Sequence, residues 1–103
     1  MPTLEIKVIK TSVFEDLASY AVLPQKPCHV FTEGQVFTTD CEKPAGFCDW
    51  AWNDLHPYVS ALLAGGSFAE GMYKGWMKDP DVVTACCTDG LRPVVFEIRR
   101  IGE

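Results

Sequence analysis

The sequence predicts a small α+β domain. A mainly antiparallel sheet of four or five strands either curls around one main helix in a barrel-like manner or packs against it, and one short helix completes the fold. Three observations predict this class: polar alternation near the N-terminus, an apolar stripe at helical spacing after Asp49, and two β-rich runs around a turn near the C-terminus. The chain has 103 residues. We expect one domain over residues 1–103, because two separate cores would each be too small to offset the chain entropy.

The first strand and the short helix are indicated by residue patterns. In residues 4–8 ("LEIKV"), apolar and charged side chains alternate, which is typical of a half-buried strand. Ser12 and Glu15 have the spacing of a capping box, in which each side chain satisfies a free backbone N–H at the start of a helix. This spacing predicts a helix over residues 12–21, and Pro24 follows its end.

The middle of the chain predicts more of the sheet and then the main helix. In residues 29–40 ("HVFTEGQVFTTD"), a Glu-Gly pair separates two β-favouring pieces, which predicts one bent strand or a tight hairpin. Asp49 is the expected N-cap of a helix that runs to Gly65 and Gly66. Pro57 removes a hydrogen bond inside this helix, so we expect a kink or a break there. The apolar stripe of the helix comprises Trp52, Leu55, Val59 and Leu62.

The runs "VVTACCT" and "VVFEIRRI" predict a hairpin whose loop length decides which cysteine faces the core. A two-residue Asp-Gly turn would put Pro93 in a hydrogen-bonded pair, where proline has no N–H to donate. We therefore expect a four-residue loop over residues 89–92. That register pairs Ala85 with Phe96, Cys86 with Val95, and Cys87 with Val94. Cys87 then lies on the apolar face and Cys86 on the other.

Composition excludes several classes of partner. The formal charge of -5 opposes binding to nucleic acid or to an anionic membrane surface. No apolar run approaches the about 20 residues that a membrane helix needs, and the first residues lack the apolar core of a signal peptide. We expect a cytoplasmic protein with no nucleic-acid or membrane partner. Its five cysteines are an odd number, and a reducing compartment keeps them as thiols.

The cysteines carry the first functional hypothesis, a thiol site for metal binding or redox chemistry. We expect it to be built from Cys48 and Cys86, with Cys28 or Cys87 in support. Cys48 lies next to a predicted helix N-terminus, where free N–H groups favour a negatively charged sulfur. Arg92 in the hairpin loop is a candidate anion contact. The hypothesis predicts that Cys48 and Cys86 converge on one cavity or lie within about 6 Å between Cα atoms. The alternative for Cys48 is simple packing beneath the tryptophans.

A zinc ion or an iron–sulfur centre is the metal form of this hypothesis. The candidate ligands are Cys48, Cys86, Cys28 and His29. No C-x2-C knuckle occurs, so any metal site has to be assembled from distant segments. A disulfide between Cys86 and Cys87 is disfavoured, because adjacent Cα atoms are about 3.8 Å apart and the usual disulfide range begins at about 4.4 Å.

The second hypothesis is a non-enzymatic interaction or self-association module whose cysteines are structural. The stretch "GGSFAEGMYKGWMKDPD" combines four glycines with large apolar side chains. We expect this loop to fold back on the body of the domain. Its residues Phe68 to Met77 would then form a surface through which the protein makes homo-oligomers.

Two blocks of the chain resemble a known family. "GFCDWAWNDLHPYVSALLAGG" and "ACCTDGLRPVVFEIRRI" are similar to the signature blocks of a family of small uncharacterised prokaryotic proteins, frequent in anaerobes. The resemblance covers most of the chain, because the opening strand and the stretches "EDLA" and "CHVFTEG" are similar in order and type. It implies a cysteine-centred function at Cys28, Cys48, Cys86 and Cys87 but no assigned activity. The loop "AEGMYKGWMKDPD" is longer than usual for the family, and Pro57 is atypical.

Overall fold

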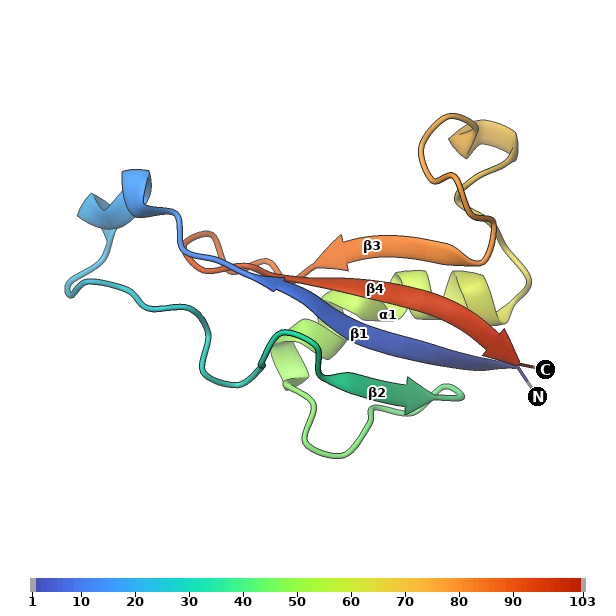
Figure 1. Cartoon of the computed structure of the whole chain (residues 1–103), viewed down its shortest axis with the longest axis horizontal. Helices are drawn as coiled ribbons and strands as arrows, with labels where there is room; N and C mark the ends of the chain where they lie inside the picture. The colour runs from blue at the N-terminus through green and yellow to red at the C-terminus, as the bar shows by residue number, and fades with distance from the viewer. Residues whose placement is uncertain (1, 103) are drawn as a thin grey trace.

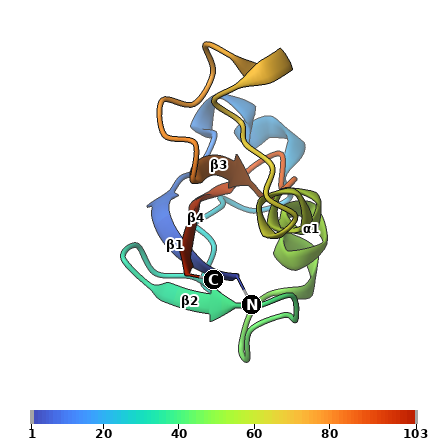
Figure 2. The same cartoon turned by 90° about the vertical axis from the view of Figure 1, so that its right-hand side faces the viewer.

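The computed structural model describes residues 2–102, which form a four-stranded antiparallel sheet with one main helix on one of its faces (Figures 1 and 2). The strands are β1 (Thr3–Thr11), β2 (Val36–Thr39), β3 (Val82–Cys86) and β4 (Val94–Gly102). They lie in the order β2-β1-β4-β3. The main helix is α1 (Asp49–Leu63), and the two short 3-10 helices are η1 (Glu15–Tyr20) and η2 (Gly71–Tyr73). The predicted α+β class is confirmed, and the sheet packs against the helix without closing into a barrel.

The core lies between the sheet and α1. Alternate residues of β1, β3 and β4 face the helix, as the polar alternation of the sequence predicts. Burying each side chain of this size stabilises the fold by about 1.5–3 kcal/mol. The side chains with no exposed surface are Leu4, Ile6, Val8, Leu55, Val59, Leu62, Val83, Phe96 and Ile98. Of the predicted helical stripe, only Trp52 is not fully buried.

The β3–β4 hairpin has the predicted register. Ala85 pairs with Phe96 and Cys86 with Val95, and the Cys87 N–H donates to the Val94 carbonyl at 3.1 Å. Pro93 lies between the loop and β4. Its missing N–H costs no hydrogen bond there, because the strand ladder does not use a donor at this position. Cys87 is therefore half-buried on the core side, and Cys86 is exposed on the other side.

Helix α1 differs from the prediction at its start and in its middle. Cys48, not Asp49, is the N-cap residue, and no side chain caps the helix there. The helix continues through Pro57, so of the two predicted outcomes the break is wrong and the kink stays a prediction. Pro57 leaves the Asn53 carbonyl without its helical donor, but both residues are exposed and water can hydrogen-bond that carbonyl. The helix ends before Gly65, whose φ of +88° suits glycine alone.

The segment after β1 does not form the predicted α-helix. Residues Glu15–Tyr20 form the 3-10 helix η1, and none of its side chains is buried. Ser12 does not cap it, because the Ser12 hydroxyl donates to the Pro93 carbonyl at 3.0 Å. A short α-helix needs an apolar face packed against the core to be stable. No residue of η1 is buried, so the segment lacks that stabilisation and forms only a 3-10 helix. It lies at one end of the molecule, away from α1 (Figure 1).

The predicted bent strand or hairpin in residues 29–40 is wrong for its first half. Only Val36–Thr39 forms a strand, β2, which pairs with β1. Gly34 has a φ of +90° and turns the chain just before it. Phe31 enters the core instead of a strand, because its ring packs edge-on against Phe96 at a centroid distance of 5.0 Å.

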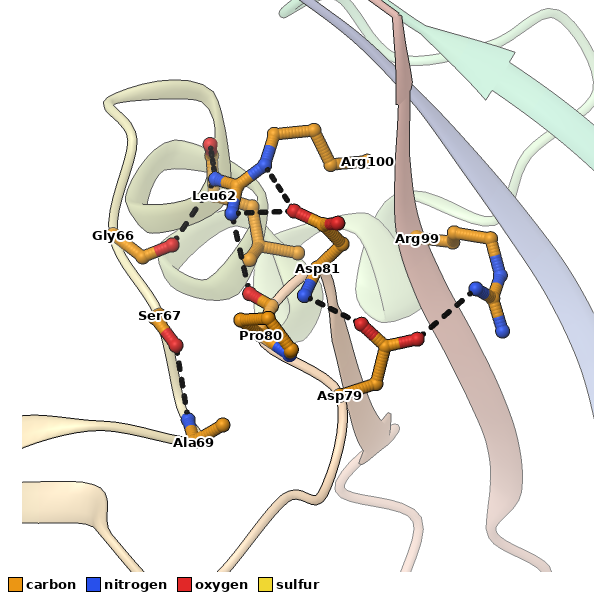
Figure 3. A network of polar contacts seen from close by, with 9 residues as sticks. All are labelled: Leu62, Gly66, Ser67, Ala69, Asp79, Pro80, Asp81, Arg99 and Arg100. Atoms are coloured by element: carbon orange, nitrogen blue, oxygen red, sulfur yellow. Dashed lines mark hydrogen bonds and ion pairs between the residues drawn. The ribbon is translucent and has the colours of Figure 1, made fainter.

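Arg100 on β4 ties the end of α1 to the sheet (Figure 3). Its Nη1 donates to the carbonyls of Leu62 and Gly66 at 2.6 and 3.0 Å. Its Nε donates to an Asp81 carboxylate oxygen at 3.0 Å, and Nη2 donates to the Pro80 carbonyl at 3.1 Å. A cation at a helix C-terminus satisfies carbonyls that lack helical donors and opposes the negative end of the helix dipole.

The loop from Phe68 to Met77, hereafter the aromatic loop, folds back only in part. Phe68 is buried and contacts Tyr58 of α1 at a ring-centroid distance of 5.6 Å. Tyr73 and Trp76 pack on Phe68 at 5.2 and 5.7 Å. The rest of the loop stands off the body beyond β3 (Figures 1 and 2). The expected return to the core is confirmed for Phe68, while Met72 is 89% exposed.

No helix within residues 2–102 combines the length and the apolar character needed to cross a membrane.

Candidate functional site

A cavity beside the N-terminus of α1 is lined by cysteines from three separate segments. Cys28 comes from the loop before β2, Cys48 is the N-cap of α1, and Cys87 follows β3. The cavity has a volume of about 170 Å³ and is hereafter the thiol cavity. All five cysteines of the chain are free thiols. Three of them therefore line one partly open cavity, although up to 59 positions separate them in the sequence.

The backbone holds two of these cysteines in fixed positions. The Cys87 sulfur accepts a hydrogen bond from the Val94 N–H at 3.3 Å, which orients the sulfur within the hairpin. The Cys48 carbonyl accepts the Trp52 N–H at 2.9 Å, the first hydrogen bond of the helix. Both cysteines are half-buried, so their sulfurs are shielded but not sealed from solvent.

A hydrogen-bonded bridge holds the start of α1 against the hairpin. Trp50, which lines the cavity, donates its Nε1–H to the Thr88 hydroxyl at 2.6 Å. The Thr88 hydroxyl in turn donates to Asp54 Oδ2 at 2.9 Å, and Asp54 Oδ2 also accepts the Thr88 N–H at 2.8 Å. This bridge links the first turn of α1, which follows Cys48, to Thr88, which follows Cys87. Sequence reasoning missed it, because no local pattern links residues that lie 34 and 38 positions apart.

The wall of the cavity includes a hydrogen-bonded charge pair, Asp89 and Arg92. The Asp89 carboxylate accepts the backbone N–H groups of Leu91 and Arg92 at 2.9 and 3.0 Å, and it accepts Arg92 Nε at 3.1 Å. Burial raises the pKa of Asp89, but these hydrogen bonds and the guanidinium charge outweigh it, so the pKa lies below its ordinary value. Arg92, the predicted anion contact, thus lines the cavity beside an ionised partner.

Cys86 does not line this cavity. It is exposed on the opposite face of β3, as the register predicts. Partial burial of its sulfur raises the pKa of Cys86, and the nearby Cys87 and Asp54 raise it further. The cavity therefore brings Cys48 together with Cys28 and Cys87, whereas the sequence favoured Cys48 with Cys86. The hairpin register explains why Cys87 and not Cys86 lines the cavity, because adjacent side chains of a strand point to opposite faces of the sheet.

Three of the four predicted metal ligands line the cavity. Cys28, His29 and Cys48 contribute to its wall, and Cys86 does not. Within residues 2–102, no group of three or more histidine, cysteine or acidic side chains is arranged to hold a metal ion.

In comparisons with protein families, curated proteins and solved structures, the chain has no significant match.

The chemistry open to the cavity follows from its own side chains. Neighbouring thiols bind soft metal ions or exchange between dithiol and disulfide. Besides the polar groups His29, Asp89 and Arg92, the rest of the wall is apolar and consists of Val30, Phe31, Trp50, Ala51 and Val94. Such a wall suits a small ligand that reaches the sulfurs.

Proposed function

We propose that the protein works by thiol–disulfide exchange in the thiol cavity, where two of Cys28, Cys48 and Cys87 alternate between dithiol and disulfide. The observation that carries the proposal is the meeting of these three cysteines on one cavity, while Cys41 and Cys86 are exposed elsewhere. The proposal includes a reducing, cytoplasmic location, which would return the site to its dithiol form. It also includes membership of the family that the sequence blocks resemble.

The proposed reaction needs only two sulfurs at a time. A thiolate of the cavity attacks one sulfur of an incoming disulfide, and the other half leaves as a thiolate that takes up a proton. A second cavity thiol then displaces the first half in the same way. The protein dithiol is oxidised to a disulfide, and the incoming disulfide is reduced to two thiols. Soft-metal binding would require three or four of the same groups to meet one ion.

Peptide mapping after controlled oxidation tests the proposal. The reduced protein is treated with one equivalent of a small disulfide, and the expected product has lost two hydrogen atoms and contains a disulfide between two cavity cysteines. The Cys41→Ser and Cys86→Ser variants should give the same product, whereas a variant with two cavity cysteines replaced should not. A disulfide that involves Cys41 or Cys86 would contradict the proposal.

Metal uptake is the competing outcome at the same site. Protein purified without air is titrated with Zn²⁺, and its free thiols are counted before and after denaturation. If one Zn²⁺ binds per protein and protects Cys28, Cys48 and Cys87 from thiol reagents, metal binding and not exchange is the function of the cavity. Thiols that stay reactive with Zn²⁺ present are the result we expect.

The aromatic loop supports a second candidate function, self-association with structural cysteines. Met72 is 89% exposed, Trp76 50% and Tyr73 41%, and the two rings pack on each other at 6.0 Å. Contiguous exposed apolar groups are typical of interfaces. Sedimentation equilibrium of the wild type and of a Met72→Ser, Trp76→Ser variant tests it. A dimer that dissociates in the variant would support this function, and a wild-type monomer at high concentration would exclude it.

A further inference from the structure

The wall of the thiol cavity includes an arginine, Arg92, whose guanidinium is hydrogen-bonded only through Nε among the described residues. Asp89 holds Arg92 through Nε at 3.1 Å, and the same carboxylate is fixed by two backbone N–H groups. Within residues 2–102, the terminal nitrogens Nη1 and Nη2 of Arg92 have no hydrogen-bond partner. The loop therefore fixes the position of Arg92 and leaves the outer edge of its guanidinium free.

On the cavity wall, the free side of the Arg92 guanidinium is the place where an anion can bind. Besides the three thiols, the titratable groups on its wall are His29, Asp89 and Arg92. Three N–H groups already hydrogen-bond the Asp89 carboxylate. The free edge of a guanidinium matches a carboxylate through two parallel hydrogen bonds. The apolar wall beside it strengthens such a contact, because the local dielectric constant is lower than that of water.

We infer that the thiol cavity takes a small disulfide bearing a carboxylate, which Arg92 binds while a cavity cysteine attacks the sulfur. This inference rests on the proposed exchange function and names its class of substrate. The cavity volume of about 170 Å³ is below the about 300–1,000 Å³ of pockets for drug-sized ligands. The half of the disulfide that enters is thus about the size of an amino acid, with its carboxylate at Arg92 and its sulfur at the thiols.

The chemical step is the exchange described above, with the substrate defined. The S–S bond of the carboxylate-bearing disulfide breaks, and a bond forms between a cavity sulfur and the half that Arg92 holds. The other half leaves as a thiol after it takes up the proton of the attacking cysteine. A second cavity cysteine then releases the bound half as a second thiol. Two protein thiols are oxidised, and one substrate disulfide is reduced.

Three small disulfides of different charge test the inference. Dithiodiglycolate is anionic, hydroxyethyl disulfide is neutral and cystamine is cationic. The protein carries Cys41→Ser and Cys86→Ser, so that only cavity thiols react, and each rate is divided by that of a free cysteine peptide. We expect dithiodiglycolate to react about tenfold faster than hydroxyethyl disulfide, as a charged hydrogen-bonded contact implies. Cystamine should be slowest, and high salt should reduce the differences.

Matched arginine variants separate a local contact from net charge. Arg92→Met should abolish the preference for the anion and Arg92→Lys should keep part of it. Arg99→Met removes the same charge from β4, outside the cavity, and should leave the preference intact. Equal normalised rates for the three disulfides in the wild type, or equal loss of preference in Arg99→Met, would overturn the inference while exchange itself stands. If no disulfide reacts with the cavity cysteines, both the inference and the proposed function fail. Should Arg92→Met not fold, the wild-type preference and its salt dependence decide.

Discussion

Among single residues, Asp89 shows how a turn residue becomes part of a site. Its carboxylate shapes the hairpin loop through two backbone N–H groups and also fixes Arg92. From sequence, an aspartate before a glycine is explained by turn chemistry alone. The structure adds a second role, because the same carboxylate positions the cation that borders the thiol cavity.

The lowered pKa of Asp89 predicts acid-sensitive stability. Because its pKa is lower in the folded than in the unfolded chain, its contribution is complete above the unfolded value of about 3.9 and is lost as the pH falls through the folded value. In urea unfolding, Asp89→Asn should be less stable than the wild type near neutral pH, and the difference should narrow below about pH 4. The exposed Asp16→Asn serves as the control. A difference that does not change with pH would contradict the ionic role of Asp89.

Cys86 illustrates that an exposed thiol is not automatically a reactive one. Partial burial, Cys87 and Asp54 raise its pKa, so less of it is thiolate at neutral pH. Asp54→Asn should therefore increase the rate of Cys86 alkylation at neutral pH, since it removes the smallest of the three causes that raise the pKa. Peptide mass spectrometry measures the rate. Asp49→Asn, which removes a charge from the same helix, is the control, and an unchanged Cys86 rate in Asp54→Asn would refute the electrostatic explanation.

Among the secondary-structure elements, the joint between α1 and β4 depends on one side chain. Arg100 satisfies the carbonyls of Leu62 and Gly66 and pairs with Asp81 (Figure 3). Its neighbour Arg99 makes more exposed ion pairs, with Asp79 at 3.3 Å and with a residue of its own strand. The two arginines are adjacent, yet only Arg100 reaches the helix.

This contrast predicts unequal costs of substitution. Arg100→Met should lower the free energy of unfolding by about 2 kcal/mol, because it leaves the Gly66 carbonyl without its donor and removes the charged donor to the Leu62 carbonyl, which keeps the Gly65 N–H. Arg99→Met should cost less than about 1 kcal/mol, as exposed ion pairs usually do. Urea unfolding of both variants measures the difference. Equal losses in the two variants would show that Arg100 does not fix the end of α1.

The elements also show what sequence reasoning reaches and where it stops. The hairpin register was predictable, because Pro93 lacks an N–H and the apolar alternation then admits one arrangement. The conformation of the first half of residues 29–40 was not predictable. Phe31 packs there against Phe96 of β4, and a local β-favouring pattern carries no information about such a distant contact. Ser12 failed as a helix cap for a similar reason, since it bonds a residue 81 positions away.

In the molecule as a whole, the candidate site exists only where three segments meet. The hairpin register placed Cys87 on the core side, but nothing local in the sequence indicates that Cys28 and Cys48 face the same space. The sheet order β2-β1-β4-β3 and the packing of α1 bring them together. The thiol cavity is therefore a property of the tertiary fold, and its chemistry depends on the contacts that hold α1 on the hairpin.

The hydrogen-bonded bridge from Trp50 through Thr88 to Asp54 is the polar contact between α1 and the hairpin next to the cavity. Thr88→Val removes the hydroxyl at its centre and should cost about 1 kcal/mol, because the groups are partly exposed and water replaces the lost bonds. Loosening the start of α1 should also make Cys48 and Cys87 react faster with thiol reagents in the folded state. Thr84→Val is the matched control, because Thr84 is an exposed threonine of β3 and lies outside the cavity wall. Faster labelling in Thr88→Val alone would tie the cavity to this bridge. If both valine variants label like the wild type, the cysteines are held by the core and not by the bridge.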